Sequence, residues 1–67
     1  MEELERLRIA LTAAEEARHL VRAQEIEVAR MKAAGLDATR AETLLRVFTE
    51  GARLADEQVV FVRRSFW

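Results

Sequence analysis

One break interrupts a chain that is otherwise suited to helices. The segment AAGLDATRAE, residues 33–42, contains Gly35, one of two glycines in 67 residues, and the chain has no proline. Alanine, leucine, glutamate and arginine, which are strong helix formers, fill most of the remainder. Because glycine adopts positive φ without a side-chain penalty, Gly35 is well placed to end a helix. The sequence therefore predicts an all-α fold with a turn at residues 35–37.

The two predicted helices span about residues 2–34 and 38–65, in a single domain over residues 1–67. A turn this short places consecutive helices side by side in opposite directions. We therefore expect an antiparallel two-helix hairpin. Two caps are possible for the second helix: Asp37 or Thr39 can accept a hydrogen bond from its free amides, and Thr39 with Glu42 has the spacing of a capping box.

Apolar residues recur every three or four positions on both helices, as in coiled coils. The first row has one irregularity, at Ala17, where a strict seven-residue repeat would place Arg18. The predicted core consists of Leu7, Leu11, Val21 and Val28 on the first helix and of Leu45, Phe48, Val59, Val62 and Phe66 on the second. The two rows are completed by Leu4, Ala14, Ala17, Gln24 and Met31, and by Ala41, Ala52 and Ala55.

Gln24 is the one polar residue within the predicted contact row. A buried amide without a partner costs about 1–3 kcal/mol. Two interpretations remain open. Gln24 either pairs with a symmetry-related Gln24 or another polar group and so fixes register and oligomer state, or it lies at the edge of the contact and reaches water.

The residues around the turn follow a recurrent pattern: a glutamine, two apolar residues, Gly-x-Asp, an alanine, two leucines and a phenylalanine. Here these are Gln24, Val28, Met31, Gly35, Asp37, Ala41, Leu44, Leu45 and Phe48, over about 25 residues. This stretch resembles a family of short, uncharacterised proteobacterial hairpin proteins. The chain departs from the pattern at Ala38, where threonine is frequent, and at His19, which is one position off. The resemblance implies a helical hairpin and no reaction.

Charge and residue types argue against several kinds of function. Eleven Lys and Arg residues are balanced by twelve Asp and Glu residues, so there is no basic field to attract nucleic acid or an acidic membrane. The chain has no cysteine and one histidine, His19, and no familiar spacing of metal ligands. His19 follows Glu15 by four residues and is interpreted as a solvent-facing partner of that carboxylate. We expect a cytoplasmic, non-enzymatic protein without cofactor or metal.

More apolar residues are present than one contact between two helices can cover. An exposed apolar patch of this kind marks an interaction site. The leading hypothesis is self-association of two hairpins into a four-helix bundle that serves as an adaptor or regulatory subunit. The predicted interface consists of Leu20, Val47, Leu54, Val60, Phe61 and Trp67; Ile9, Ile26 and Leu44 are also left over.

Two other classes of partner stay open. A nucleic-acid-binding hairpin dimer would use Arg18 and Arg22, with Arg8 as a further candidate, although acidic neighbours dilute their charge. An accessory subunit would dock its apolar C-terminal tail, residues 59–67, onto a larger or membrane-bound complex.

Overall fold

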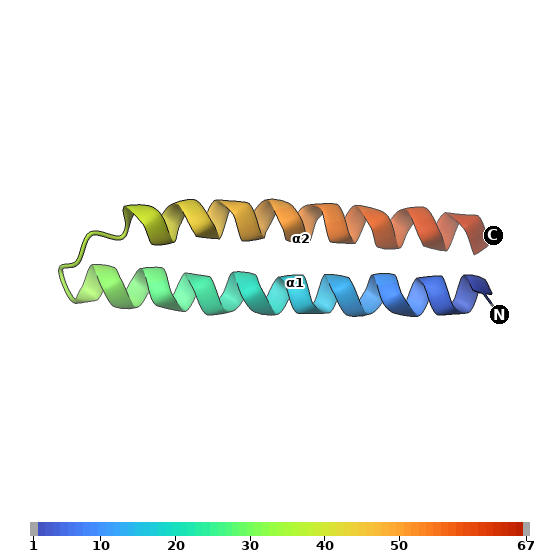
Figure 1. Ribbon diagram of the computed structural model, residues 1–67, viewed down its shortest axis with the longest axis horizontal. Coiled ribbons are helices and arrows are strands. Elements are labelled where there is room, and N and C mark those ends of the chain that lie inside the picture. Colours follow the sequence, from blue (N-terminus) through green and yellow to red (C-terminus); the bar gives the residue numbers. More distant parts are fainter. Residues whose placement is uncertain (1, 67) are drawn as a thin grey trace.

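The chain folds into two long antiparallel helices joined by a short turn (Figure 1). This computed structural model describes residues 2–66, with side chains as far as Ser65. Helix α1 runs from Glu2 to Ala33 and helix α2 from Thr39 to Phe66. The start of α1 and the end of α2 lie at the same end of a rod whose Cα atoms extend over 51 × 13 × 12 Å. The predicted all-α hairpin is confirmed.

Charged residues at the helix ends match the helix dipole. The first turn of α1 carries Glu2, Glu3 and Glu5, and its last turn carries Arg30 and Lys32. Negative charge is favourable at the amino end of a helix and positive charge at the carboxyl end. The local sequence therefore supports α1 along its whole length.

Gly35 ends α1 as the sequence predicts. Its φ is 73°, in the left-handed region. The Gly35 N–H donates to the Lys32 carbonyl at 3.0 Å, and the Leu36 N–H donates to the Met31 carbonyl at 2.9 Å. This pair of bonds is the Schellman motif, which satisfies carbonyls that the end of a helix would otherwise leave free.

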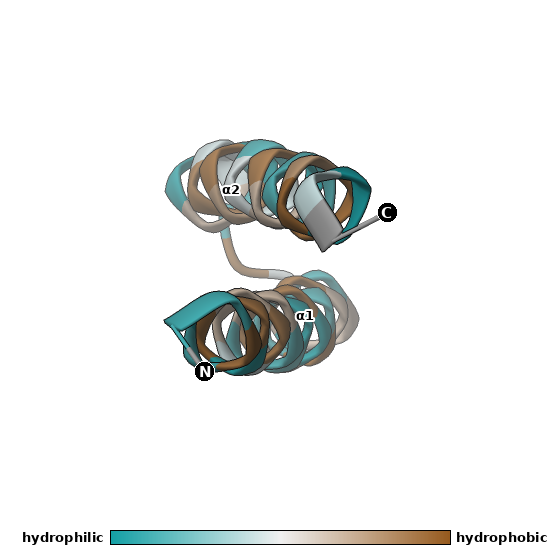
Figure 2. Cartoon of the chain, turned by 90° about the vertical axis from the view of Figure 1, so that its right-hand side faces the viewer, coloured by the Kyte–Doolittle hydropathy of each residue, from teal (hydrophilic) through white to brown (hydrophobic). Residues whose placement is uncertain are grey.

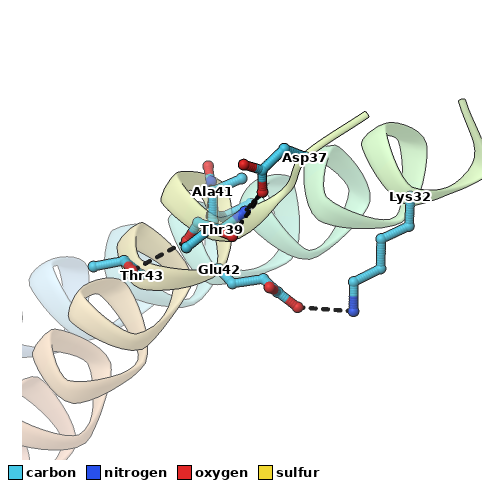
Figure 3. A network of polar contacts seen from close by, with 7 residues as sticks. Lys32, Asp37, Thr39, Ala41, Glu42 and Thr43 are labelled. Atoms are coloured by element: carbon cyan, nitrogen blue, oxygen red, sulfur yellow. Dashed lines mark hydrogen bonds and ion pairs between the residues drawn. The ribbon is translucent and has the colours of Figure 1, made fainter. Parts of the chain in front are cut away.

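Asp37, and not Thr39, caps the start of α2 (Figure 3). The Thr39 N–H donates to the Asp37 Oδ1 at 3.0 Å, and the Thr39 hydroxyl donates to the same oxygen at 2.6 Å. These bonds lower the pKa of Asp37, the hydroxyl bond more than the amide bond. The capping box of Thr39 and Glu42 is wrong, because Asp37 already occupies the Thr39 amide and the Glu42 carboxylate pairs with Lys32 of α1 at 2.8 Å.

The helices meet along one row on each, which we call the inner stripe. Its residues are Leu7, Ala10, Ala14, Ala17, Val21, Gln24, Val28 and Met31 on α1, Ala38 just before α2, and Ala41, Leu45, Phe48, Ala52, Ala55, Val59 and Val62 on α2, all buried or half-buried. Steps of three and four alternate strictly along both rows, which is the seven-residue repeat of a coiled coil. The irregularity predicted at Ala17 is therefore wrong.

Ala10 takes the core position that the sequence analysis gave to Leu11. Ala10 is 7% exposed, whereas Leu11 is 43% exposed and Leu4 is 58% exposed. A regular repeat from Leu7 to Ala14 passes through Ala10, and the next residue points about 100° further round the helix. The regular spacing, and not the size of the side chain, therefore determines which of the two residues is buried.

The rest of the predicted core lies on the inner stripe. Val28, Val59 and Val62 are buried, and Leu7, Val21, Leu45 and Phe48 are half-buried. The side chain of Phe66 lies outside the described residues.

Gln24 is bonded within its own hairpin. Its Nε2 donates to the Ala41 carbonyl oxygen at 2.9 Å, at a half-buried position. The partner is the main chain of the facing helix, and not a symmetry-related Gln24 or water. The bond ties α1 to the first turns of α2.

Candidate interaction surface

The core of the hairpin is made of small side chains. The buried apolar residues in the described part of the chain are five alanines and three valines: Ala10, Ala14, Val28, Ala38, Ala41, Ala52, Val59 and Val62. Every described leucine, isoleucine and phenylalanine up to position 61 is at most half-buried. The inner stripe therefore leaves most of the large apolar side chains without full cover.

One side of the inner stripe is polar. Arg18 of α1 pairs with Asp56 of α2 at 2.8 Å, and Lys32 pairs with Glu42 at 2.8 Å. Arg18 and Lys32 are two seven-residue repeats apart on α1, and so are Asp56 and Glu42 on α2. All four therefore flank the inner stripe on the same side, where e positions of antiparallel helices meet.

The other side of α2 carries a second row, which is apolar except at Gln58 and which we call the outer stripe. It consists of Leu44, Val47, Gly51, Leu54, Gln58 and Phe61, and all six residues are exposed. Their spacing of 3, 4, 3, 4 and 3 residues is again the repeat of a coiled-coil contact. In the view along the rod, the apolar colouring of α2 is not confined to the side that faces α1 (Figure 2).

The outer stripe lies about 100° round α2 from the inner stripe, away from the ion pairs. Val47 and Phe61 are each 60% exposed, and Leu54 is 50% exposed. On α1, Leu20 flanks the inner stripe on this same side and is exposed as well. Four of the predicted interface residues therefore lie on one continuous side of the hairpin.

Gly51 lies near the middle of the outer stripe. A Cβ atom added at Gly51 would meet no atom within 4 Å. Glycine in the interior of a helix is less favourable than alanine by about 1 kcal/mol. Packing within the hairpin gives no reason for a glycine at this position.

The other predicted interface residues stand apart from the outer stripe. Val60 is exposed and lines an open depression on α2 together with Arg53, Asp56, Glu57, Phe61 and Arg64. Its neighbours there are four charged side chains and Phe61, the last residue of the outer stripe. Trp67 lies outside the described residues. Their place in an interface stays a prediction.

Several surface arginines are engaged by nearby partners. Arg53 pairs with both Glu50 and Glu57, and Arg30 pairs with Glu27 at 2.7 Å. The hydrogen bonds from these guanidinium groups lower the pKa values of Glu27 and Glu50. These arginines are therefore part of solvated ion pairs.

His19 lies on the exposed surface of α1 beside Glu15. Its Nε2 is 3.9 Å from the Glu15 Oε1, and its Nδ1 is 3.2 Å from the Arg22 guanidinium. This geometry agrees with the solvent-facing interpretation of His19. In residues 2–66 no group of three or more His, Cys, Asp or Glu side chains is arranged to hold a metal ion.

The hairpin exposes more surface than a compact protein of its mass. Its accessible surface is 5248 Å², whereas a compact monomer of 7.7 kDa exposes about 4300 Å². The excess, about 900 Å², is close to the ~800 Å² that each partner buries in a standard protein–protein interface. Covering one side of the rod would bring the exposed surface into the ordinary range.

No family model matches the chain, and no curated protein or solved structure matches it. The resemblance around the turn therefore stays a prediction. Among the described residues, neither helix has a stretch long and apolar enough to cross a bilayer.

Proposed function

We propose that this protein is a non-enzymatic interaction module that self-associates through the outer stripe of α2. The observation that supports this most directly is the contrast between a core of alanine and valine and a second, regularly spaced row of exposed leucine, valine and phenylalanine. Chains of fewer than 70 residues rarely obtain sufficient stability from one core. With no cysteine for a disulfide, burial against a second hairpin is a direct route to that stability.

Two hairpins that meet through their outer stripes form a four-helix bundle. At the corner of a square bundle each helix contacts two neighbours at a right angle. The inner and outer stripes of α2 are separated by about 100°, which is close to that requirement. In the cell such a bundle presents its remaining faces to another protein, in the role of an adaptor or regulatory subunit.

Self-association is tested by sedimentation and light scattering between about 0.1 and 100 μM protein. We expect the mass of a dimer at the upper end of this range and dissociation on dilution. A protein that stays monomeric and fully helical at 100 μM would refute the proposal.

Docking of the C-terminal tail onto a larger complex remains an alternative. The last three residues of the sequence are Ser65, Phe66 and Trp67, and they follow the end of the outer stripe at Phe61. A truncation after Arg64 separates the two functions. It leaves the outer stripe complete and removes the last three residues, so the dimer should persist while any tail-dependent partner is lost.

A further inference from the structure

We propose that two copies of the chain pack α2 against α2 in antiparallel orientation, about a two-fold axis that passes between Gly51 and Leu54. This inference rests on the proposed self-association. It adds which helices meet, in which direction and in which register.

The outer stripe is self-complementary about that axis. A two-fold axis brings the same surface of each copy together, so every contact occurs twice. The midpoint of the stripe lies between Gly51 and Leu54. Antiparallel packing about this point places Leu44 against Phe61 of the second copy, and Gly51 against Leu54 of the second copy.

The second helix explains why residue 51 is a glycine. Within one hairpin an added Cβ would enter open space, so the glycine relieves no clash there. Opposite Leu54 of a second copy, the missing side chain leaves room for the leucine. Large residues facing small ones in this way allow two helices to interdigitate closely.

The polarity of α1 argues against α1 as the partner of the outer stripe. The matching positions of α1 are Ile9, Ala13, Glu16, Leu20, Ala23, Glu27 and Arg30. Packing α2 on this row would bring the carboxylates of Glu16 and Glu27 into the apolar contact. Burial against leucine would remove the water that solvates these carboxylates and would supply no hydrogen-bond donor in its place. The one partner that Glu27 has among the described residues, Arg30, lies on the same row of α1.

The area that such a contact requires is also present. The excess exposed surface of the hairpin, about 900 Å², matches the ~800 Å² that each partner contributes to a stable interface. The outer stripe extends over 18 residues, or about 27 Å of helix. Leu20 of α1, which is exposed on the same side, adds to this apolar length.

Cysteine cross-linking tests the register, because the chain has no cysteine of its own. The antiparallel contact places residue 47 beside residue 58 of the second copy. Two single variants, Val47→Cys and Gln58→Cys, are unfolded together, refolded and oxidised. We expect a disulfide between positions 47 and 58 as the main product.

Two controls use the same variants. Val47→Cys oxidised alone should give little dimer, because its two copies would lie about 16 Å apart along the axis, beyond the reach of a disulfide. Val47→Cys mixed with Ala23→Cys should also give little, since these positions meet only when α2 packs on α1. Circular dichroism and light scattering of each reduced variant establish that it is folded and dimeric.

The outcomes separate the two proposals. A dimer whose main product joins positions 47 and 23, or two copies of position 47, overturns the antiparallel α2 contact and leaves self-association standing. A dimer without any link at position 47 does the same. A folded monomer overturns both.

Discussion

The side-chain amide of Gln24 on α1 donates a hydrogen bond to the main-chain carbonyl of Ala41 on α2 at 2.9 Å. The bond joins helices that are otherwise held by apolar contacts, and it lies at a half-buried position. We expect Gln24→Ala to lower the free energy of unfolding by about 1 kcal/mol, the usual net value of one hydrogen bond. Urea denaturation at fixed protein concentration measures the change.

The exposed neighbour Glu25 supplies the control for Gln24. Glu25→Ala removes a side chain of similar length from the same turn and should change the free energy of unfolding by less than about 0.5 kcal/mol. Equal losses in the two variants would show that the bond to Ala41 contributes nothing of its own.

Asp37 gives the hairpin a pH-dependent cap. The hydroxyl and the amide of Thr39 lower its pKa, so its stabilising effect is complete above the ordinary pKa of aspartate, about 3.9, and is lost as pH falls through the lower pKa of the folded state. Asparagine keeps an acceptor at this position but does not titrate. We expect wild type to melt at a higher temperature than Asp37→Asn at pH 7.

Other carboxylates titrate equally in wild type and Asp37→Asn, so the difference between the two proteins isolates Asp37. The difference in melting temperature should shrink as pH is lowered from 5 to 2. Thermal denaturation followed by circular dichroism measures it at each pH. A difference that stays constant over this range would exclude a charge-dependent cap.

The two glycines should respond oppositely to alanine. Neither has an atom within 4 Å of an added Cβ, so backbone conformation decides the outcome. Gly35 has a φ of 73°, and Gly35→Ala should cost about 1–2 kcal/mol. Gly51 is helical, and Gly51→Ala should stabilise the separate hairpin by about 1 kcal/mol.

Association adds a second readout at Gly51. In the proposed dimer a Cβ at position 51 would meet Leu54 of the second copy, so Gly51→Ala should raise the dissociation constant while it raises helicity in dilute solution. Sedimentation over a concentration series and circular dichroism at low concentration measure the two effects. An alanine variant that is both more helical and more tightly associated would contradict the close contact at Gly51.

The smaller residue, Ala10, lies in the contact between the helices, whereas the larger residue, Leu11, lies outside it. Ala10 is 7% exposed between the helices, so Ala10→Leu should overpack the contact and cost about 1–3 kcal/mol. Leu11 is 43% exposed, so Leu11→Ala should cost less than Ala10→Leu. Chemical denaturation of the two variants at one protein concentration compares them directly. A larger loss for Leu11→Ala would place Leu11 in a contact that the single hairpin does not show.

Local signals made the fold predictable from the sequence. Gly35 and the absence of proline determined where the helices end, because positive φ at a helix end strongly favours glycine. Asp37 was one of two possible caps, and the structure decides between them because the Asp37 carboxylate accepts from the Thr39 amide. Locating the turn required no knowledge of contacts between the helices, whereas the role of Glu42 depends on its pair with Lys32 of α1.

The details of the interhelical contact were harder to predict. Ala10 was missed because apolar size was weighted above strict spacing, although the seven-residue repeat through Leu7 and Ala14 already indicated it. The partner of Gln24 could not be read from the sequence, since it is a main-chain carbonyl selected by the register of the two helices. The surplus of apolar residues was visible in the sequence. Their alignment with Gly51 into one stripe could be recognised only after the structure had shown which residues of α2 face α1.

Phe61 offers the most direct separation of folding from association. Its side chain is 60% exposed at one end of the outer stripe, so it contributes little to the hairpin itself. Phe61→Ser should therefore leave the helicity of the hairpin largely unchanged and should weaken the dimer at least tenfold, because burial of an aromatic side chain is lost in each copy. Sedimentation over a concentration series measures the change in the dissociation constant.

Ile26 is the matched control for Phe61, because it is a large apolar residue that is 70% exposed and lies on α1 away from both stripes. Ile26→Ser should alter neither helicity nor association, which would show that the effect depends on position rather than on apolar surface in general. If Phe61→Ser unfolds the protein without a change in association, Phe61 belongs to the core and the contact between copies lies elsewhere. If both variants weaken the dimer equally, association is non-specific and the outer stripe has no special role.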